Sequence, residues 1–186
     1  MRIIAGKYKG RIITHVAPNG VRPTTDRVRE SIFNILSNVL DFEAIRVLDL
    51  CAGTGALGLE AISRGAGFCS FVELSKVTSN LLKKTITQLN IKPENYEVVT
   101  MDSCLFAKKF SNFTLQSYDL IFVDPPYKNK LINPIFRLIN VNQILTSGGF
   151  FVAEHDIRET ILQIENFEQI NKRQFGETVI DIFQLK

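Results

Sequence analysis

The stretch Arg46-Val47-Leu48-Asp49-Leu50-Cys51-Ala52-Gly53-Thr54-Gly55-Ala56-Leu57-Gly58 decides how the rest of the chain is interpreted. Its apolar first half predicts a buried strand, with Asp49 near the end of that strand. The glycines follow at G-x-G-x-x-G spacing and predict a tight turn that opens a helix. A strand, a glycine turn and a helix N-terminus together hold the polar end of a nucleotide-like cofactor. The glycines equally suit a tight turn that binds nothing, because such turns need positive φ angles.

The chain on either side of this stretch alternates between predicted strands and helices. We expect strands at residues 47–50, 68–72, 96–101, 120–123 and 150–154, then an antiparallel pair at 167–175 and 178–185. We expect helices at 55–64, 75–89, 105–110 and 132–141, with a weak helix before the last strand pair. This alternation predicts an α/β fold with a doubly wound, mostly parallel sheet of seven strands over residues 43–186.

Residues 1–42 precede this domain and predict an extension. Two short β-type runs, 2–5 and 11–16, flank a glycine-bounded turn and predict a hairpin. A loop rich in proline and glycine follows. A helix is expected from Thr24 or Thr25 to about Leu40. Its buried stripe is predicted to be Val28, Ile32, Ile35, Leu36 and Val39.

Positive charge is concentrated in this extension. The whole chain has a net charge of +3, but residues 1–30 hold seven basic residues and two acidic ones. Such a basic segment on a near-neutral body favours a polyanionic partner such as nucleic acid, although a solvated charged face is the simpler interpretation. The candidate contacts with such a partner are Lys7, Lys9, Arg11, Arg22, Arg27 and Arg29, and the family resemblance described below implies that this partner is RNA.

Several classes of protein are disfavoured by the composition. We find no apolar run of about 18 residues and no apolar core of a signal peptide, so we expect a cytoplasmic protein that does not contact a membrane. The three cysteines are odd in number and fit reduced thiols better than a disulfide framework. No spacing predicts a metal site, and nothing demands more than a monomer.

Three acidic residues at predicted strand ends narrow the choice of cofactor. Glu73 stands where an acid binds the hydroxyls of a ribose, which fits either NAD or S-adenosylmethionine. Asp49 would repel a pyrophosphate but suits an ammonium group, such as that of S-adenosylmethionine. Asp102 could accept a hydrogen bond from an adenine amino group, or it could simply cap the next helix.

The stretch Asp124-Pro125-Pro126-Tyr127 follows the fourth predicted strand. Two prolines make a stiff turn with few N–H donors, so the Pro125 carbonyl and the Asp124 carboxylate can both accept hydrogen bonds from an exocyclic amine. Tyr127 offers a ring on which a base could stack. A purely structural interpretation is that the stretch forms a proline turn after an edge strand. Because it ends the fourth predicted strand of a chain whose first strand leads into a glycine-rich turn, a catalytic role is favoured.

The motifs together resemble class I S-adenosylmethionine-dependent amino-methyltransferases, which have a Rossmann-like fold. The segments RIIAGKYKGR, RPTTDRVRESIFNIL, DLCAGTGALGLEAISRGA, VDPPY and QFGETVIDIFQL resemble the RsmD family in order and spacing over nearly the whole chain. The N-terminal pair of segments is the most specific to that family.

The resemblance implies an enzyme that methylates the N2 amine of a guanine in small-subunit (16S) ribosomal RNA, within an assembled subunit. The resemblance also implies which residues bind the cofactor: Asp49, Gly53, Gly55, Glu73 and Asp102. It implies that the target guanine is bound by Asp124, Pro125, Pro126 and Tyr127. The residues alone leave open a methyltransferase acting on DNA adenine or cytosine or on protein glutamine, and a nucleotide- or RNA-binding module without catalysis.

Overall fold

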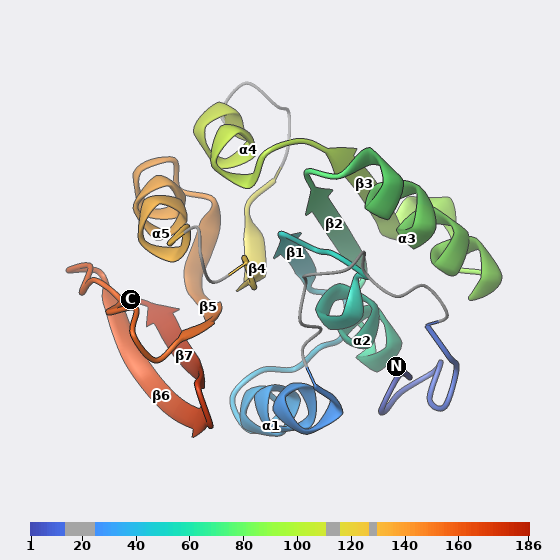
Figure 1. Cartoon of the computed structure of the whole chain (residues 1–186), viewed down its shortest axis with the longest axis horizontal. Helices are drawn as coiled ribbons and strands as arrows, with labels where there is room; N and C mark the ends of the chain where they lie inside the picture. Colours follow the sequence, from blue (N-terminus) through green and yellow to red (C-terminus); the bar gives the residue numbers. More distant parts are fainter. Residues whose placement is uncertain (14–24, 111–115, 127–129) are drawn as a thin grey trace.

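The computed structural model describes residues 1–13, 25–110, 116–126 and 130–186. Seven strands form one sheet in the order β3-β2-β1-β4-β5-β7-β6 (Figure 1). The strands are β1 (Arg46–Leu50), β2 (Phe68–Glu73), β3 (Tyr96–Thr100), β4 (Tyr118–Val123), β5 (Leu145–Asp156), β6 (Phe167–Phe175) and β7 (Thr178–Leu185). The first five are parallel, and β7 pairs antiparallel with both β5 and β6. The predicted doubly wound sheet is confirmed.

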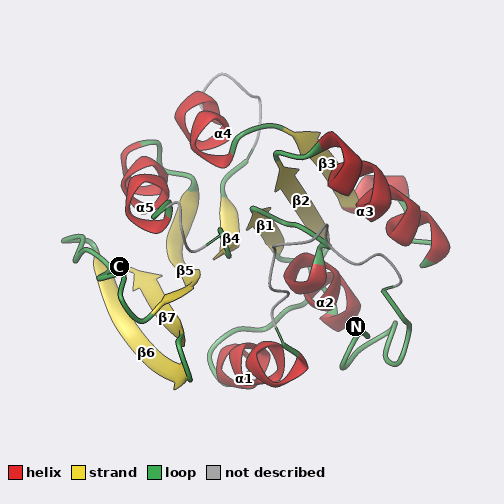
Figure 2. Ribbon diagram, viewed as in Figure 1, coloured by secondary structure: helices red, strands yellow, loops and turns green. Residues whose placement is uncertain are grey.

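The α-helices of the described residues cover the two faces of this sheet (Figure 2). They are α1 (Asp26–Leu36), α2 (Ala56–Arg64), α3 (Lys76–Gln88), α4 (Ser103–Lys109) and α5 (Ile132–Val141), with a short 3₁₀ turn, η1 (Pro93–Asn95), before β3. Side chains from α1, α2 and α3 pack in one core, and those from α4 and α5 pack in the other. Alternate strand residues serve the two cores, so Phe122 faces α1 and Val123 faces α5. None of these helices is long and apolar enough to cross a membrane.

The strand order reverses between β1 and β4. From β1 the chain first moves outward to β2 and β3, then returns to β4 on the other side of β1. In open α/β sheets the crevice beyond the carboxyl ends of the strands at such a reversal is the usual ligand site. The glycine turn after β1 and Asp124 after β4 both lie at this edge of the sheet.

Helix α1 is shorter than predicted. Thr25 caps it by accepting a hydrogen bond from the N–H of Val28, as expected, but the helix ends at Leu36. The backbone then tightens: Asn38 N–H bonds to Ile35 and Val39 N–H to Leu36. This rotates Val39 off the buried stripe, so the prediction that Val39 is buried was wrong, and its side chain is 51% exposed.

The segment between β5 and β6 is not the weak helix that we expected. Residues 157–166 contain no helix. The side chain of Asn133, on α5, accepts a hydrogen bond from the N–H of Leu162 and donates one to the carbonyl of Thr160. These contacts hold the segment against α5, and a local sequence pattern does not encode them.

The N-terminal hook, residues 1–13, folds back on itself and docks on α2. The N–H of Ile3 donates a hydrogen bond to the carbonyl of Arg11, and the carbonyl of Ile3 accepts one from Gly10. Arg2 and Ile12 form an antiparallel bridge, as expected of a hairpin. Residues 14–16, which were also predicted to belong to it, lie outside the described residues. The buried carboxylate of Glu60 accepts hydrogen bonds from the N–H groups of Ile4 and Ala5 and so fixes the hook to α2.

Candidate active site

The turn between β1 and α2 adopts the left-handed backbone conformation at three alternate residues. The φ angles are +62° at Cys51, +54° at Gly53 and +75° at Gly55. Cys51 is not a glycine, and the left-handed conformation costs a residue with a side chain of the order of 1 kcal/mol. Strained backbone of this kind is common in the turns of functional sites. Gly55 then occupies the N-cap position of α2, where it leaves the helix N-terminus without a capping side chain. The turn has the geometry of a cradle for a polar ligand.

Glu73 closes one side of the cradle from the end of β2. One carboxylate oxygen accepts a 2.9 Å hydrogen bond from Gly53 N–H, and the other accepts a 2.8 Å bond from Ser75 N–H. Each oxygen retains a second lone pair, so the carboxylate can also accept hydrogen bonds from two adjacent hydroxyl groups. Ribose binding by Glu73 stays a prediction.

Asp49 lies deeper than predicted. Its side chain is buried, and it accepts a 2.9 Å hydrogen bond from Gly58 N–H in the first turn of α2. Burial raises the pKa of Asp49 to about 8; the bond from Gly58 opposes this shift and the charge of Glu73 adds to it. A ligand ammonium group near Asp49 would favour the charged form of this carboxyl group and lower its pKa.

The third glycine serves packing. A Cβ atom at Gly58 would lie 2.3 Å from the ring of Phe71 and 2.7 Å from the sulfur of Cys69, both on β2. Only a glycine lets α2 approach the sheet this closely.

Cys51 lies in the electrostatic field of three predicted site residues. Burial raises the pKa of its thiol to about 12; the hydrogen bond with Ser103 opposes this shift, and the charges of Asp124, Glu73 and Asp49 add to it. These three carboxylates come from β1, β2 and the end of β4, and all of them act on this one turn residue. Ser103, which accepts a hydrogen bond from Cys51 N–H, was not predicted.

Asp102 is the N-cap of α4. Its side chain accepts a 2.8 Å hydrogen bond from Leu105 N–H, which confirms one of its two predicted roles. The residue is half-buried and precedes Ser103, the partner of Cys51. Contact with an adenine amino group stays a prediction.

The proline turn leaves the sheet directly beside the glycine turn. The backbone nitrogen of Asp124 lies 3.5 Å from the carbonyl oxygen of Leu50, the last residue of β1. Asp124 is half-buried, Pro125 is buried and Pro126 is exposed. Tyr127 lies outside the described residues. The two motifs, which are about 70 residues apart in the sequence, thus meet at the reversal of strand order.

The basic residues predicted to contact RNA differ in their exposure to solvent. Lys9 and Arg11 are exposed on the N-terminal hook, as is Lys7, and Arg27 is exposed at the start of α1. Arg22 lies outside the described residues.

Arg29 was assigned wrongly. Its side chain is fully buried, and it donates hydrogen bonds to the carbonyl of Arg2 and to Asp26 while lying 3.9 Å from Glu60. The guanidinium fastens the N-terminal hook to α1 and is not accessible to a phosphate. The local sequence gives no sign of this, because Glu60 is 31 residues away.

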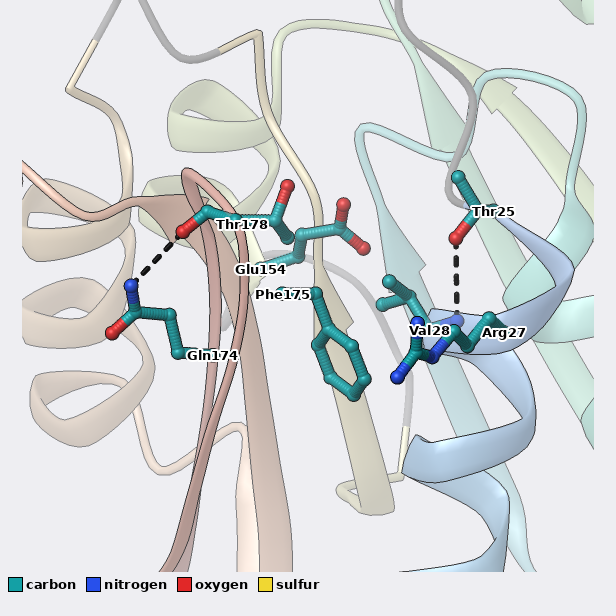
Figure 3. A pocket seen from close by; sticks show the side chains of 8 residues that line it. Thr25, Arg27, Val28, Glu154, Gln174, Phe175 and Thr178 are labelled. Carbon is teal, nitrogen blue, oxygen red and sulfur yellow. Dashed lines mark hydrogen bonds between the residues drawn. The ribbon is translucent and has the colours of Figure 1, made fainter.

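Two further residues outside the predicted site have defined surroundings. His155 is buried, and its Nε2 atom lies 2.7 Å from a carboxylate oxygen of Asp181. Glu154 lines a cavity between α1 and the β6–β7 hairpin (Figure 3). Among residues 1–13, 25–110, 116–126 and 130–186, no cluster of His, Cys, Asp or Glu side chains is suited to a metal ion.

Comparison with known proteins agrees with this architecture. A family model described as "Conserved hypothetical protein 95" matches residues 1–184. A protein from Buchnera aphidicola subsp. Acyrthosiphon pisum, described as "Ribosomal RNA small subunit methyltransferase D", is 36% identical over 92% of this chain and 86% of its own length. A solved structure described as "Putative methyltransferase yhhF from Escherichia coli" matches with a TM-score of 0.85 at 28% identity, covering 100% of this chain and 98% of that one.

A further structure, described as "SMU.776, a putative methyltransferase complexed with SAH", shares the fold at 19% identity and a TM-score of 0.68, over 89% of this chain and 50% of that one. The fold and the site define a Rossmann-like methyltransferase whose cofactor is S-adenosylmethionine. Within that class, the chain belongs to the conserved hypothetical protein 95 family, which is the RsmD family that its motifs resemble.

Proposed function

We propose that this protein transfers a methyl group from S-adenosylmethionine to the exocyclic N2 amine of a guanine in small-subunit (16S) ribosomal RNA. The relatives support the RNA substrate, since the proteins from Buchnera and from Escherichia coli strain K12 are both described as ribosomal RNA small subunit methyltransferase D. The exposed basic side chains of the N-terminal hook suit a polyanion.

The observation that carries the proposal is the meeting of the two turns. Asp124 and Pro125 leave β4 next to Leu50, where the glycine turn begins. An amine held by Asp124 and the Pro125 carbonyl would therefore lie beside a cofactor held by the glycine turn. Holding two reactants in line at such a junction removes much of the entropic barrier to their reaction.

The residues of the proline turn suit a poorly nucleophilic amine. The lone pair of a guanine amine is delocalised into the ring. Two acceptors, the Asp124 carboxylate and the Pro125 carbonyl, can bind its two N–H bonds and favour a pyramidal nitrogen whose lone pair points at the methyl group. We propose that Tyr127 stacks on the base, which must leave its helix to reach the site.

The cofactor residues hold the other reactant. The bound cofactor supplies an electrophilic methyl group. Glu73 would bind its ribose, Asp102 its adenine amine, and the Gly53–Gly55 turn with Asp49 its methionine end. After transfer the amine carries an extra proton, which Asp124 or water accepts. Because the alkylated amine is acidic, Asp124 acts first as an orienting group.

The proposal is tested by Asp124→Ala. Removing the acceptor should lower the rate of methyl transfer to small ribosomal subunits by about 10²–10³-fold, while cofactor affinity measured by calorimetry changes little. Glu94→Ala, at an exposed acid before β3, is the matched control. Turnover at the wild-type rate in Asp124→Ala would remove Asp124 from the mechanism.

A further inference from the structure

A cavity of about 440 Å³ lies between the start of α1 and the tip of the β6–β7 hairpin (Figure 3). We name it the base cavity. It is lined by Thr25, Arg27, Val28, Glu154, Gln174, Phe175, Gly176 and Thr178. Figure 3 shows Glu154 and Phe175 facing the start of α1 across this space. The volume falls in the range of small-molecule sites.

The base cavity adjoins the proline turn. Val123 pairs with Ala153 in the parallel β4–β5 ladder, so Asp124 and Glu154 are the next residues on neighbouring strands. Neighbouring strands lie about 4.8 Å apart. Glu154 projects from the same face as Val152, which packs in the core shared with α1. A base whose amine is bound by Asp124 is therefore within reach of Glu154.

We propose that the base cavity receives the guanine ring and that Glu154 determines the choice of base. This inference rests on the proposed function and deepens it. Guanine presents adjacent donors, N1–H and the N2 amine, beside its O6 acceptor. Glu154 accepts the hydrogen bond from N1–H while Asp124 and Pro125 bind the amine. In adenine the N1 atom is an acceptor, so its lone pair would face the lone pairs of the carboxylate, and binding would be disfavoured.

Two other residues complete the complement to guanine. Phe175 supplies an aromatic ring on which a base can stack. The guanidinium of Arg27 lies 5.8 Å from the centre of that ring and lines the same cavity, so it can donate a hydrogen bond to the O6 atom. An acceptor for N1–H and a donor for O6 would also suit the N3–H and O4 groups of uracil, but uracil has no exocyclic amine. Together with the two amine acceptors at Asp124 and Pro125, the set matches guanine alone among the four bases.

The test compares two RNA substrates with wild-type enzyme and Glu154→Gln. One substrate carries guanine at the target position. The other carries 2,6-diaminopurine, which keeps the N2 amine but has an acceptor in place of N1–H and an amine in place of O6. Wild-type enzyme should prefer guanine by about 10- to 100-fold in kcat/KM. Glu154→Gln should lower kcat/KM on guanine and shrink that preference, because its amide can donate to N1 of diaminopurine. Cofactor affinity should not change.

The control is Glu177→Gln, the same chemical change at an exposed hairpin residue outside the base cavity. It should behave as the wild type. An undiminished preference for guanine in Glu154→Gln would overturn the inference, as would a wild-type enzyme that does not distinguish the two bases.

If Glu154→Gln does not fold, Phe175→Leu provides the second test: it should raise KM for the RNA and leave cofactor affinity intact, and an unchanged KM would overturn the inference. Failure of the proposed function looks different, because the wild-type enzyme would then leave the guanine substrate itself unmethylated.

Discussion

The buried carboxylate of Asp49 accepts a 2.9 Å hydrogen bond from the backbone N–H of Gly58. The contact joins the central strand β1 to the first turn of α2, on either side of the cofactor cradle. It stabilises the turn, but it places a carboxyl group where burial raises its pKa to about 8. The protonation state of this one carboxyl group therefore affects the stability of the turn.

Asp49 should make the stability of the cofactor-free protein depend on pH. Its pKa is higher in the folded chain than the ordinary value of 3.8, so the folded state retains a proton that the unfolded state releases. This contribution is complete below about pH 4 and is lost as pH rises toward 8. The slope is about 1.4 kcal/mol per pH unit between pH 5 and 8.

The variant Asp49→Asn cannot titrate and should flatten this dependence. Urea denaturation across pH 5–8 measures it, with Glu94→Gln as the exposed control. A fall in stability with pH that is the same in Asp49→Asn and wild type would show that Asp49 is already ionised in the folded protein.

Glu60 should contribute to global stability through the N-terminal hook. Its buried carboxylate binds the N–H groups of Ile4 and Ala5 and accepts a hydrogen bond from Arg64. Glu60→Gln removes the charge opposite buried Arg29 and should cost about 3 kcal/mol. Chemical denaturation measures this decrease, and limited proteolysis should cut first within residues 1–13. A decrease below about 1 kcal/mol would contradict this role for Glu60.

Gly58→Ala should destabilise the protein even though alanine favours helices. The added methyl would lie 2.3 Å from the ring of Phe71, and such overpacking typically costs about 1–3 kcal/mol. The double variant with Phe71→Leu makes room for the methyl, so its destabilisation should be smaller than the sum of the two single effects. Additive effects would show that the clash with Phe71 is not the cause.

The N-terminal hook should contribute to RNA affinity without affecting the cofactor. Changing Lys7, Lys9 and Arg11 to Gln should weaken RNA binding. In a plot of the logarithm of the binding constant against the logarithm of the salt concentration, the slope should decrease by about one unit for each phosphate that the variant no longer neutralises. Binding titrations at several salt concentrations measure both quantities. The matched control changes exposed Lys83, Lys84 and Lys92, which lie on and just after α3. Equal weakening in the two triple variants would mean that net charge, and not the hook, governs affinity.

Features that depend on local pattern can be predicted from the sequence. The buried strands, the glycine turn and the cap at Thr25 are each encoded within a few residues. The sheet and the meeting of Asp49, Glu73 and Asp124 could therefore be anticipated from the rule that ligands bind at the carboxyl ends of parallel strands.

The predictions that were wrong or missing concern residues whose surroundings come from distant parts of the sequence. Arg29 looked like a surface cation because Glu60, which lies beside it, comes from another helix. The segment after β5 is held by the side chain of Asn133 on α5. Glu154 could not be assigned a role, because its cavity is formed by α1 and the β6–β7 hairpin, two segments far apart in the chain.

The most direct test of the proposed activity is nucleoside mass spectrometry of the product. Small ribosomal subunits that lack the modification would be incubated with the enzyme and S-adenosylmethionine carrying a deuterated methyl group, then digested to nucleosides. We expect the label in N2-methylguanosine and in no other nucleoside. Label in a different nucleoside, or no label although calorimetry shows that the cofactor binds, would contradict guanine-N2 methylation by this protein.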